Sequence, residues 1–261
     1  MKRPGPGHTC LLAAHRGGAL LWPENSLLAF RNAIALGVDF LECDAHLSKE
    51  GEVVVIHDPT LPRTTTGAGA VRERTLAELR ALRLKDKDGE VTEEAIPNLE
   101  EVVGLAAPTP LRLLVEIKGD PKRARYPGIE EKVLAILDRH RMAERVIVIA
   151  FEEETLHRVR TLRPDVFVGG LYSPRTLKQK RSTVEEGIEA LRGLDARFVG
   201  LHQELVTAEV AAQVREAGLF LGVWTVNETE GMRRFIGLGV DVLITDRPDL
   251  ARELLNQRRG P

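Results

Sequence analysis

Residues 98–118 read NLEEVVGLAAPTPLRLLVEIK and contain one complete helix–strand unit. Apolar side chains recur at helical spacing over 98–106, which predicts a helix. The leucine- and valine-rich run that follows predicts a strand over 113–117. That strand ends in Glu116 and Lys118, which lie two positions apart and therefore share one face of the strand. The stretch thus predicts a helix, a buried strand and two charged groups at the strand's end.

The same unit recurs along the whole chain. Strands are predicted over 11–14, 39–44, 113–117, 146–150, 166–171, 198–201, 219–224 and 241–245. Helices are predicted over 26–37, 98–106, 129–139, 152–162, 184–192, 207–217, 228–237 and 248–257. Strands that alternate with helices pair in parallel, and eight such units are the number that closes a (β/α)8 TIM barrel. A doubly wound open sheet is the structural alternative, and the number of units favours the barrel.

One segment departs from this alternation between the second strand and the helix that follows it. Residues 45–97 contain a further short strand over 53–57, a weak helix over 76–82 and a charged run over 85–90. A barrel needs no such excursion, so we predict that this segment contains an insertion over the C-terminal mouth. Long loops at this end of a barrel usually shape the active site.

The composition excludes several classes of protein. A chain of 261 residues can bury one large core, and we expect a single TIM-barrel domain over residues 1–261. Its 37 basic and 39 acidic residues nearly balance, which gives no sign of nucleic-acid binding. Cys10 and Cys43 lie in apolar runs, and free thiols in a reducing cytosol explain them better than a disulfide.

The N-terminal region contains no targeting signal that we can identify. The apolar stretch before His15 is too short for a signal peptide or a membrane span. We therefore expect a soluble cytoplasmic protein without stable membrane association. Its oligomeric state stays open, a homo-oligomer included.

Three carboxylates lie at the ends of apolar runs. Glu42 and Asp44 flank Cys43, and Glu116 has the same position in the later strand. Burying such acids beside one another is costly without a cation. Mg²⁺ and Ca²⁺ prefer carboxylate oxygens, and the set lacks the thiolates that suggest zinc. We predict that the three acids hold one divalent cation, Mg²⁺ or Ca²⁺. Ordinary strand-end acids paired with arginines are the alternative.

Two histidines also follow apolar runs. His15 is followed directly by Arg16, and His57 is followed by Asp58. Imidazole can hold or release a proton near neutrality, and cleavage of a phosphodiester needs one group to activate a nucleophile and another to protonate the departing alkoxide. We predict that His15 and His57 are catalytic, and that Asp58 orients His57 or the loop. Hydrogen-bonded structural histidines are the alternative.

Four further residues are predicted to bind substrate. Arg16 offers a planar fork and Lys118 a compact charge for phosphate oxygens, although both could merely neutralise the acids. Glu24 is assigned to a substrate hydroxyl, with a metal ligand or a group that complements the helix dipole as alternatives. Trp224 ends a predicted strand and is expected to form an apolar wall for a small alcohol; a core tryptophan is the alternative.

Other polar stretches receive smaller roles. His46 shares the face of Glu42 but lies further along the chain, so we expect it to hydrogen-bond in a loop. His202 follows an apolar run, and a position facing the pocket is considered for it but is not the favoured one. Residues 178–181 (KQKR) are expected to form a solvated loop. The surrounding region, 172–193, fits no motif and is a candidate determinant of substrate preference.

Several motifs occur in a fixed order along the chain. The first half contains His15-Arg16-Gly17, Pro23-Glu24-Asn25-Ser26, Glu42-x-Asp44, His57-Asp58-Pro59-Thr60-Leu61, Arg63-Thr64-Thr65 and Gly67. The second half contains Ile96-Pro97-x-Leu99-Glu100-Glu101, Glu116-Ile117-Lys118, Trp224-Thr225-Val226-Asn227, Gly239-Val240-Asp241 and Thr245-Asp246-Arg247-Pro248. In this order the motifs resemble the glycerophosphodiester phosphodiesterase family. The resemblance covers nearly the whole chain and depends on no single motif.

The resemblance implies a (β/α)8 barrel with a small insertion near 59–98. It also implies hydrolysis of a small-molecule glycerophosphodiester to glycerol 3-phosphate and a free alcohol, a reaction of lipid and glycerol metabolism. By this resemblance, metal binding would fall to Glu42, Asp44 and Glu116, and acid–base catalysis to His15 and His57. Phosphate binding would fall to Arg16 and Lys118, and contact with glycerol to Trp224.

Two other functions compete with this one. A lysophospholipase-D-like enzyme that acts on lipids would need an apolar loop surface, and residues 59–98 are too charged to suggest one. A non-catalytic phosphate- or sugar-binding barrel would need no pair of proton carriers. Three points stay open: which alcohol leaves, which metal is used in the cell, and whether the nucleophile is water or the glycerol 2-hydroxyl.

Overall fold

The computed structural model describes residues 10–259, and nine strands form one sheet. The strands are β1 (Leu11–Ala14), β2 (Phe40–Leu47), β3 (Val53–Val55), β4 (Arg112–Ile117), β5 (Val146–Ala150), β6 (Phe167–Tyr172), β7 (Phe198–His202), β8 (Phe220–Trp224) and β9 (Val242–Thr245). All eight predicted barrel strands are confirmed, and the further strand predicted over 53–57 is β3.

The sheet closes on itself because β1 pairs in parallel with both β2 and β9. From β1 the order runs through β9, β8, β7, β6, β5 and β4 to β2, so the strands form a TIM barrel. An open doubly wound sheet would leave two edges where this sheet closes, so that alternative is wrong. Strand β3 stands apart, since it pairs antiparallel with the far end of β2.

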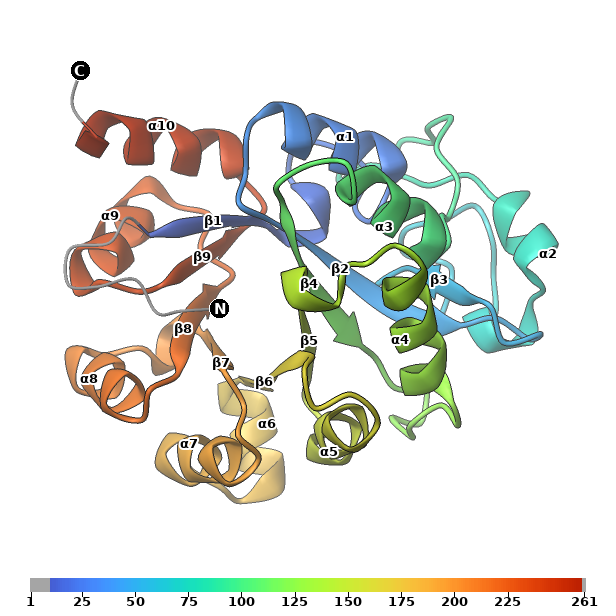
Figure 1. Cartoon of the computed structure of the whole chain (residues 1–261). Coiled ribbons are helices and arrows are strands. Elements are labelled where there is room, and N and C mark those ends of the chain that lie inside the picture. The colour runs from blue at the N-terminus through green and yellow to red at the C-terminus, as the bar shows by residue number, and fades with distance from the viewer. Residues whose placement is uncertain (1–9, 260–261) are drawn as a thin grey trace.

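Helices surround the barrel (Figure 1). They are α1 (Leu27–Ala35), α2 (Leu76–Arg80), α3 (Leu99–Ala106), α4 (Ile129–Arg139), α5 (Glu153–Leu162), α6 (Pro174–Lys180), α7 (Val184–Gly193), α8 (Ala208–Glu216), α9 (Thr229–Leu238) and α10 (Pro248–Arg259). Within the described chain, no helix has the length and apolar character that crossing a membrane requires.

Helix α6 corrects the prediction that residues 178–181 form a loop. Ser173 and Thr176 make a capping box at its start, and Pro174 occupies its first turn. Only Leu177 of this short helix is buried. Because one buried side chain gives no helical period, the pattern in the sequence did not reveal the helix.

One face of every barrel strand points into the interior of the barrel. A buried apolar cluster fills it with side chains from β1, β2 and β4–β9: Ala13, Phe40, Leu114, Ile147, Ile149, Leu171, Phe198, Phe220, Val242 and Ile244. Side chains alternate along a strand, so residues two positions onward from this layer also face inward. On β2, β4 and β8 those residues are Glu42, Glu116 and Gly222.

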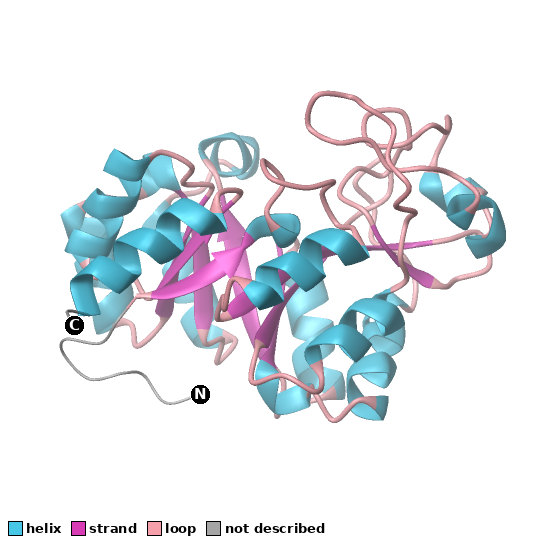
Figure 2. Ribbon diagram, turned by 90° about the horizontal axis from the view of Figure 1, so that it is seen from above, coloured by secondary structure: helices cyan, strands magenta, loops and turns pink. Residues whose placement is uncertain are grey.

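The segment after β3 has a small apolar cluster of its own. Its buried members are Val54, Ile56, Leu61, Val71, Leu79, Leu84 and Ile96. In Figure 2 this segment, which includes α2, projects to one side of the barrel. It reaches back through Arg63, which hydrogen-bonds Glu24, and through Arg72, which pairs with Asp120. The extra strand β3 fits the predicted insertion after the second strand. That the inserted segment lies over the mouth of the barrel stays a prediction.

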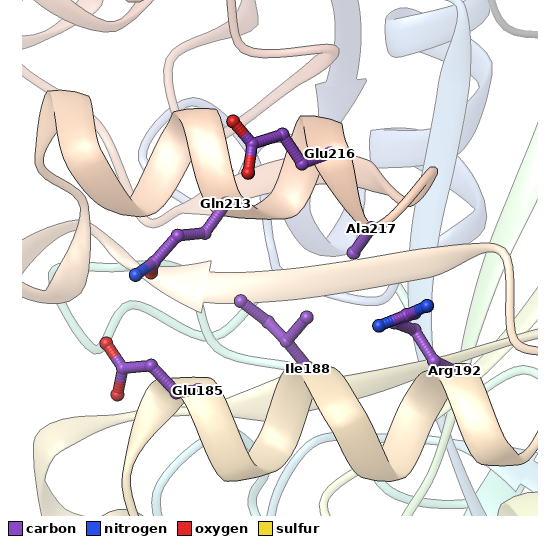
Figure 3. Close-up of a pocket in the computed structure, with 6 residues that line it drawn as sticks. All are labelled: Glu185, Ile188, Arg192, Gln213, Glu216 and Ala217. Atoms are coloured by element: carbon purple, nitrogen blue, oxygen red, sulfur yellow. The ribbon is translucent and has the colours of Figure 1, made fainter.

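The outer helical layer contains a hollow of about 280 Å³ between α7 and α8. Figure 3 shows Glu185, Ile188 and Arg192 from α7 opposite Gln213, Glu216 and Ala217 from the end of α8. These side chains include no imidazole or thiol, and we assign no function to the hollow.

Candidate active site

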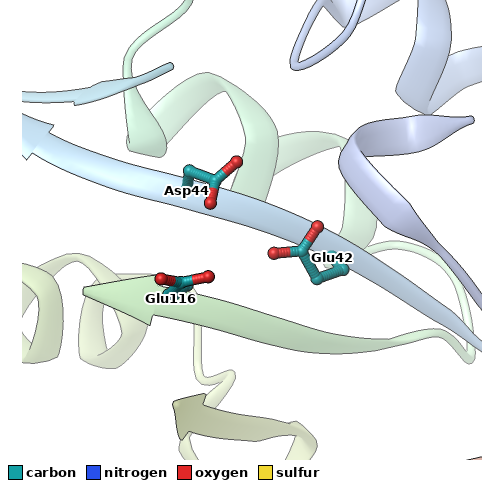
Figure 4. A group of neighbouring side chains, drawn as sticks. All are labelled: Glu42, Asp44 and Glu116. Atoms are coloured by element: carbon teal, nitrogen blue, oxygen red, sulfur yellow. The ribbon is translucent and has the colours of Figure 1, made fainter. Parts of the chain in front are cut away.

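Three carboxylates gather where β2 and β4 approach the mouth of the barrel. The parallel register places Asp44 opposite Glu116, and Glu42 precedes Asp44 on the same face. One ligand oxygen from each residue lies within 4.8 Å of the others (Figure 4). All three residues are buried, with Asp44 fully enclosed. The predicted cluster is therefore present as a compact acidic cage.

Burial and mutual repulsion act on the charges of this cage. Burial raises the pKa of Glu42 well above its ordinary value, and the charges of Asp44 and Glu116 raise it further. Burial also acts to raise the pKa of Asp44, but the charges of Lys118, His57 and Arg16 hold it well below its usual range. The cage therefore contains carboxylates that repel one another unless positive charge lies among them.

Two cations supply part of that charge. The Lys118 ammonium lies 2.7 Å from Glu116 Oε1 and 3.3 Å from Asp44 Oδ1. The Arg16 guanidinium lies 3.4 Å from Asp44 Oδ2 and 3.2 Å from Glu24 Oε1. Burial opposes the charge on Lys118, yet Glu116 and Asp44 raise its pKa, so the side chain stays protonated.

The donor set fits a hard divalent cation. Asp44 Oδ1 is buried and accepts no hydrogen bond from the described residues, although Lys118 lies near it. Three clustered carboxylates are the ligand type that Mg²⁺ and Ca²⁺ prefer. A dication among these oxygens would relieve the repulsion that raises the pKa of Glu42.

His15 is oriented by a carboxylate from the far end of the chain. Its Nδ1 lies 2.6 Å from Asp246 Oδ1, which leaves Nε2 on the side of Glu42, 3.9 Å from Oε2. Asn227 donates a hydrogen bond to Asp246 Oδ2 and accepts one from the Asp246 backbone N–H. Burial acts to raise the pKa of Asp246, but the hydrogen bond with His15 lowers it. The imidazole is therefore held by an ionised partner.

His57 is oriented in the same way by its neighbour. Its Nδ1 lies 2.6 Å from Asp58 Oδ1, so of the two predicted roles for Asp58, orienting His57 or orienting the loop, the geometry favours the first. Arg63 donates to Asp58 Oδ2 at 2.6 Å and to both oxygens of Glu24 at 2.9 and 2.8 Å. The hydrogen bond from His57 lowers the pKa of Asp58, and Arg63 adds to the effect. One arginine of the inserted segment thus joins two loops of the site.

The turn after β1 places Arg16 over the cage. Arg16 and Gly17 both have positive φ, at 52° and 81°, and the Arg16 backbone N–H donates to Glu42 Oε2 at 2.8 Å. A Cβ at Gly17 would lie 2.7 Å from the Cβ of Ala29 on α1. Glycine is therefore required where this turn packs against α1.

A cavity of about 120 Å³ unites most of the predicted site residues. It is lined by both histidines, both cations and two of the acids, together with an apolar wall: His15, Arg16, Glu42, His57, Glu116, Lys118, Ile149, Phe151, Leu171, Trp224 and Ile244. Trp224 makes edge contacts with Phe151 and His202, and its buried indole N–H has no acceptor among the described residues. Asp44 and Glu24 are not among the lining residues.

Other predicted residues have different positions from those expected. His46 lies in β2 instead of a loop, where its ring hydrogen-bonds the Tyr126 hydroxyl at 2.9 Å and the His57 carbonyl at 3.0 Å. His202, by contrast, lies against Trp224 and is absent from the lining of the cavity, which agrees with the expectation that it does not face the pocket.

Three residues that contact the site were not assigned individually from the sequence. Asn25 donates to Asp44 Oδ2 at 2.8 Å, Asp246 contacts His15 directly, and Arg63 holds Asp58, the partner of His57. Asp246 follows β9 directly, so the rule that polar groups at strand ends meet could have found it. Arg63 belongs to one of the motifs that carry the resemblance, but its contact with Glu24 could not be read from the sequence, because 39 positions separate the two residues.

The fold and the position of these groups define the class of protein. Enzymes on (β/α)8 barrels keep their chemistry at the carboxyl ends of the strands, and the cavity lies at this end. Its paired cations and imidazoles suit an anionic ester. The chain is thus a barrel enzyme with a site built for an anion.

Comparison with known proteins identifies the family. Residues 15–250 match the glycerophosphoryl diester phosphodiesterase family. A glycerophosphodiester phosphodiesterase of Caldanaerobacter subterraneus is 36% identical over 248 residues, which cover 95% of this chain and 98% of that protein. The chain belongs to the glycerophosphodiester phosphodiesterase family of phosphoric diester hydrolases, which confirms the resemblance.

Solved structures agree with this assignment. A putative glycerophosphoryl diester phosphodiesterase of Agrobacterium tumefaciens has a TM-score of 0.88 at 30% identity, over 97% of this chain and 100% of that chain. A phosphodiesterase of Oleispira antarctica, solved with its product sn-glycerol 3-phosphate, has a TM-score of 0.79 at 25% identity, over 95% of this chain and 97% of that chain.

Proposed function

We propose that this protein hydrolyses glycerophosphodiesters to glycerol 3-phosphate and a free alcohol, with one Mg²⁺ or Ca²⁺ bound by Glu42, Asp44 and Glu116. The observation that supports it most is the arrangement of His15, His57, Arg16 and Lys118 around one cavity beside the acidic cage. The relative from Oleispira antarctica holds sn-glycerol 3-phosphate, which supports the same product here.

The residues of the chain would divide the reaction as follows. Arg16 and Lys118 bind the phosphoryl oxygens, where negative charge grows in the transition state. One imidazole accepts a proton from the attacking hydroxyl, and the other donates a proton to the alkoxide as its bond to phosphorus breaks. A bound divalent cation supplies Lewis-acid neutralisation of phosphoryl charge. Trp224 forms the wall for glycerol, and its free N–H suits a hydroxyl of the substrate.

We assign the proton donor to His57 and the acceptor to His15. His57 also lines a second, larger cavity beyond the first, whereas His15 lines only the first. The leaving alcohol needs room on the side of the group that protonates it, and His57 has that room. Glu24 would hold Arg16 and Arg63 in place, because it accepts hydrogen bonds from both, and it would also bind a substrate hydroxyl.

The inserted segment 59–98 would form part of the wall of the mouth. Arg63 and Arg72 of this segment contact Glu24 and Asp120 in two loops at this end of the barrel, which supports that position. The single-domain organisation, the cytoplasmic location and any homo-oligomer stay predictions.

The test is release of glycerol 3-phosphate from glycerophosphocholine, with and without EDTA. His15→Ala and His57→Ala should each lower kcat by about 100-fold or more, because each removes a positioned proton carrier. His157→Ala, at an exposed position of α5, is the matched control and should retain full activity. Near wild-type turnover in either active-site variant would remove that histidine from the mechanism. Binding without turnover by the wild type would favour the non-catalytic barrel.

A further inference from the structure

A second cavity of about 580 Å³ continues from the first. The two cavities share His57, Glu116, Lys118 and Phe151, so the second begins on the side of the proposed proton donor. Its outer part is lined by the loop after β4, the loop after β5 and helix α6. This is the region near 172–193 that the sequence motifs left without a role.

Three cations line this outer part, and neutral groups hold two of them. Arg123 donates to the side-chain oxygen of Gln179 at 2.8 Å. Lys180 donates to the backbone carbonyl of Phe151 at 2.7 Å and also makes a longer ion pair with the Glu153 carboxylate at 3.9 Å. Arg175, exposed at the start of α6, makes no ion pair with any residue of the described chain. A neutral acceptor orients a cation without cancelling its charge.

Most carboxylates of the same lining are already neutralised. Asp120 pairs with Arg72 at 2.6 Å and accepts two backbone N–H groups. Asp58 is bound by His57 and Arg63, and Glu116 by Lys118. Glu152, exposed on the rim, is the remaining acid of the lining, so the outer cavity has an excess of positive charge.

We propose that this second cavity binds the leaving alcohol, and that Arg123, Arg175 and Lys180 select an alcohol that bears an anionic group such as a carboxylate. The proposal rests on the proposed function, because His57 at the boundary between the cavities sets the side from which the alcohol leaves. The ester bond would lie in the first cavity, with the anionic end of the alcohol towards α6. An alcohol whose only charge is an ammonium group would meet the same cations without a favourable partner.

The effect should be moderate, because the cations lie near solvent. Ion pairs of this kind contribute little each, so we expect a preference of about fivefold. The preference should decrease as salt is added, because salt screens charges near the surface.

The test compares glycerophosphoserine with glycerophosphoethanolamine, two substrates that differ by one carboxylate. Wild-type kcat/KM should be about fivefold higher for the serine ester at low salt. Arg175→Gln should lower the ratio of the two kcat/KM values about threefold, and Arg175→Glu should lower it further. Lys178→Gln removes a charge from the same helix at a position outside the lining, and it should leave the ratio unchanged.

Calorimetric binding of the two esters to EDTA-treated protein provides a readout that needs no turnover. The serine ester should bind more tightly to the wild type, and Arg175→Gln should reduce that difference. Equal kcat/KM values for the two esters, or an equal effect of Arg175→Gln and Lys178→Gln, would overturn the proposal while the phosphodiesterase activity stood. If the protein hydrolysed none of the three substrates (the two esters and glycerophosphocholine), the proposed function would be overturned, and the proposal with it.

Discussion

At the scale of single residues, each of the two histidines is held by a carboxylate, but different residues hold the two carboxylates. Each uses Nδ1 to contact a carboxylate at 2.6 Å, which leaves Nε2 for proton transfer. Asp246, the partner of His15, is held by Asn227, whereas Asp58 is held by Arg63 from the inserted segment. His57 therefore depends on a contact outside the barrel itself.

Substitution of Arg63 tests whether His57 depends on this contact with the inserted segment. Arg63→Gln removes the guanidinium that joins Asp58 to Glu24, so His57 loses part of its orientation. We expect kcat to fall about tenfold with a smaller change in KM, as is typical for a residue that acts through another. Arg83→Gln, an exposed position in the same segment, is the control and should have no effect. If KM alone changed, Arg63 would contribute to binding and not to the position of His57.

The acidic cage predicts that a divalent cation stabilises the fold. Binding at 100 times the dissociation constant adds about 2.7 kcal/mol to the free energy of unfolding. For a chain of this length, each kcal/mol raises the melting temperature by about 2–4 °C. Thermal unfolding of EDTA-treated protein, with and without Mg²⁺ or Ca²⁺, measures the shift.

Glu42→Gln is the matched variant for this experiment. It removes a ligand charge but keeps an oxygen that can accept the Arg16 backbone N–H. Because burial and like charges act against the ionised Glu42, the metal-free variant should be at least as stable as the metal-free wild type. Its metal-induced shift should be much smaller. An unchanged shift in this variant would exclude Glu42 from the metal site.

At the scale of helices and strands, most boundaries followed from the sequence. The helix predicted over 98–106 is α3 (Leu99–Ala106), and Asn98 is its capping residue. Strands were found because apolar runs ended in polar residues, whereas α6 was missed because a single buried leucine has no period. Helix α6 was therefore outside the reach of the hydrophobic pattern, although four of its residues line the second cavity.

The start of α1 gives a prediction at this scale. Ser26 is buried, and its hydroxyl accepts the Ala29 backbone N–H at 3.0 Å. Ser26→Ala should lower the free energy of unfolding by about 1 kcal/mol, because that N–H loses its acceptor. Ser26→Thr retains the hydroxyl and should cost less. Urea unfolding measures both, and equal losses in the two variants would mean that the cap contributes nothing.

At the scale of the whole molecule, closure of the barrel explains why the site is only partly visible in the sequence. The register of β1 with β9 sets Ala14 opposite Thr245, so the next residues, His15 and Asp246, meet although 231 positions separate them. The three acids could be predicted because they mark the ends of two apolar runs, Glu42 and Asp44 on β2 and Glu116 on β4. The strand-end rule could point to Asp246, but its pairing with His15, and the contacts that Arg63 makes from the inserted segment, needed the three-dimensional structure.

The packing inside the barrel yields the last prediction. Phe198 fills the interior against strands that have glycine where a side chain would collide with it. A Cβ at Gly222 would lie 2.3 Å from the Phe198 ring, and one at Gly169 would lie 2.7 Å from it. Phe198→Ala should cost about 3–5 kcal/mol of unfolding free energy because it leaves a cavity. Gly222→Ala should cost about 1–3 kcal/mol because it overpacks the same space.

A double-mutant cycle separates this explanation from general sensitivity of the core. Once Phe198→Ala has removed the ring, the methyl group of Gly222→Ala has room, although the tip of Ile244 still lies 3.3 Å away. The second substitution should then cost at least about 1 kcal/mol less than it does alone. Gly237→Ala in α9, where an added Cβ meets nothing within 4 Å, is the control and should show no such coupling. Additive losses for Phe198→Ala and Gly222→Ala would mean that the ring does not determine the need for glycine on β8, since the two sites would then act independently.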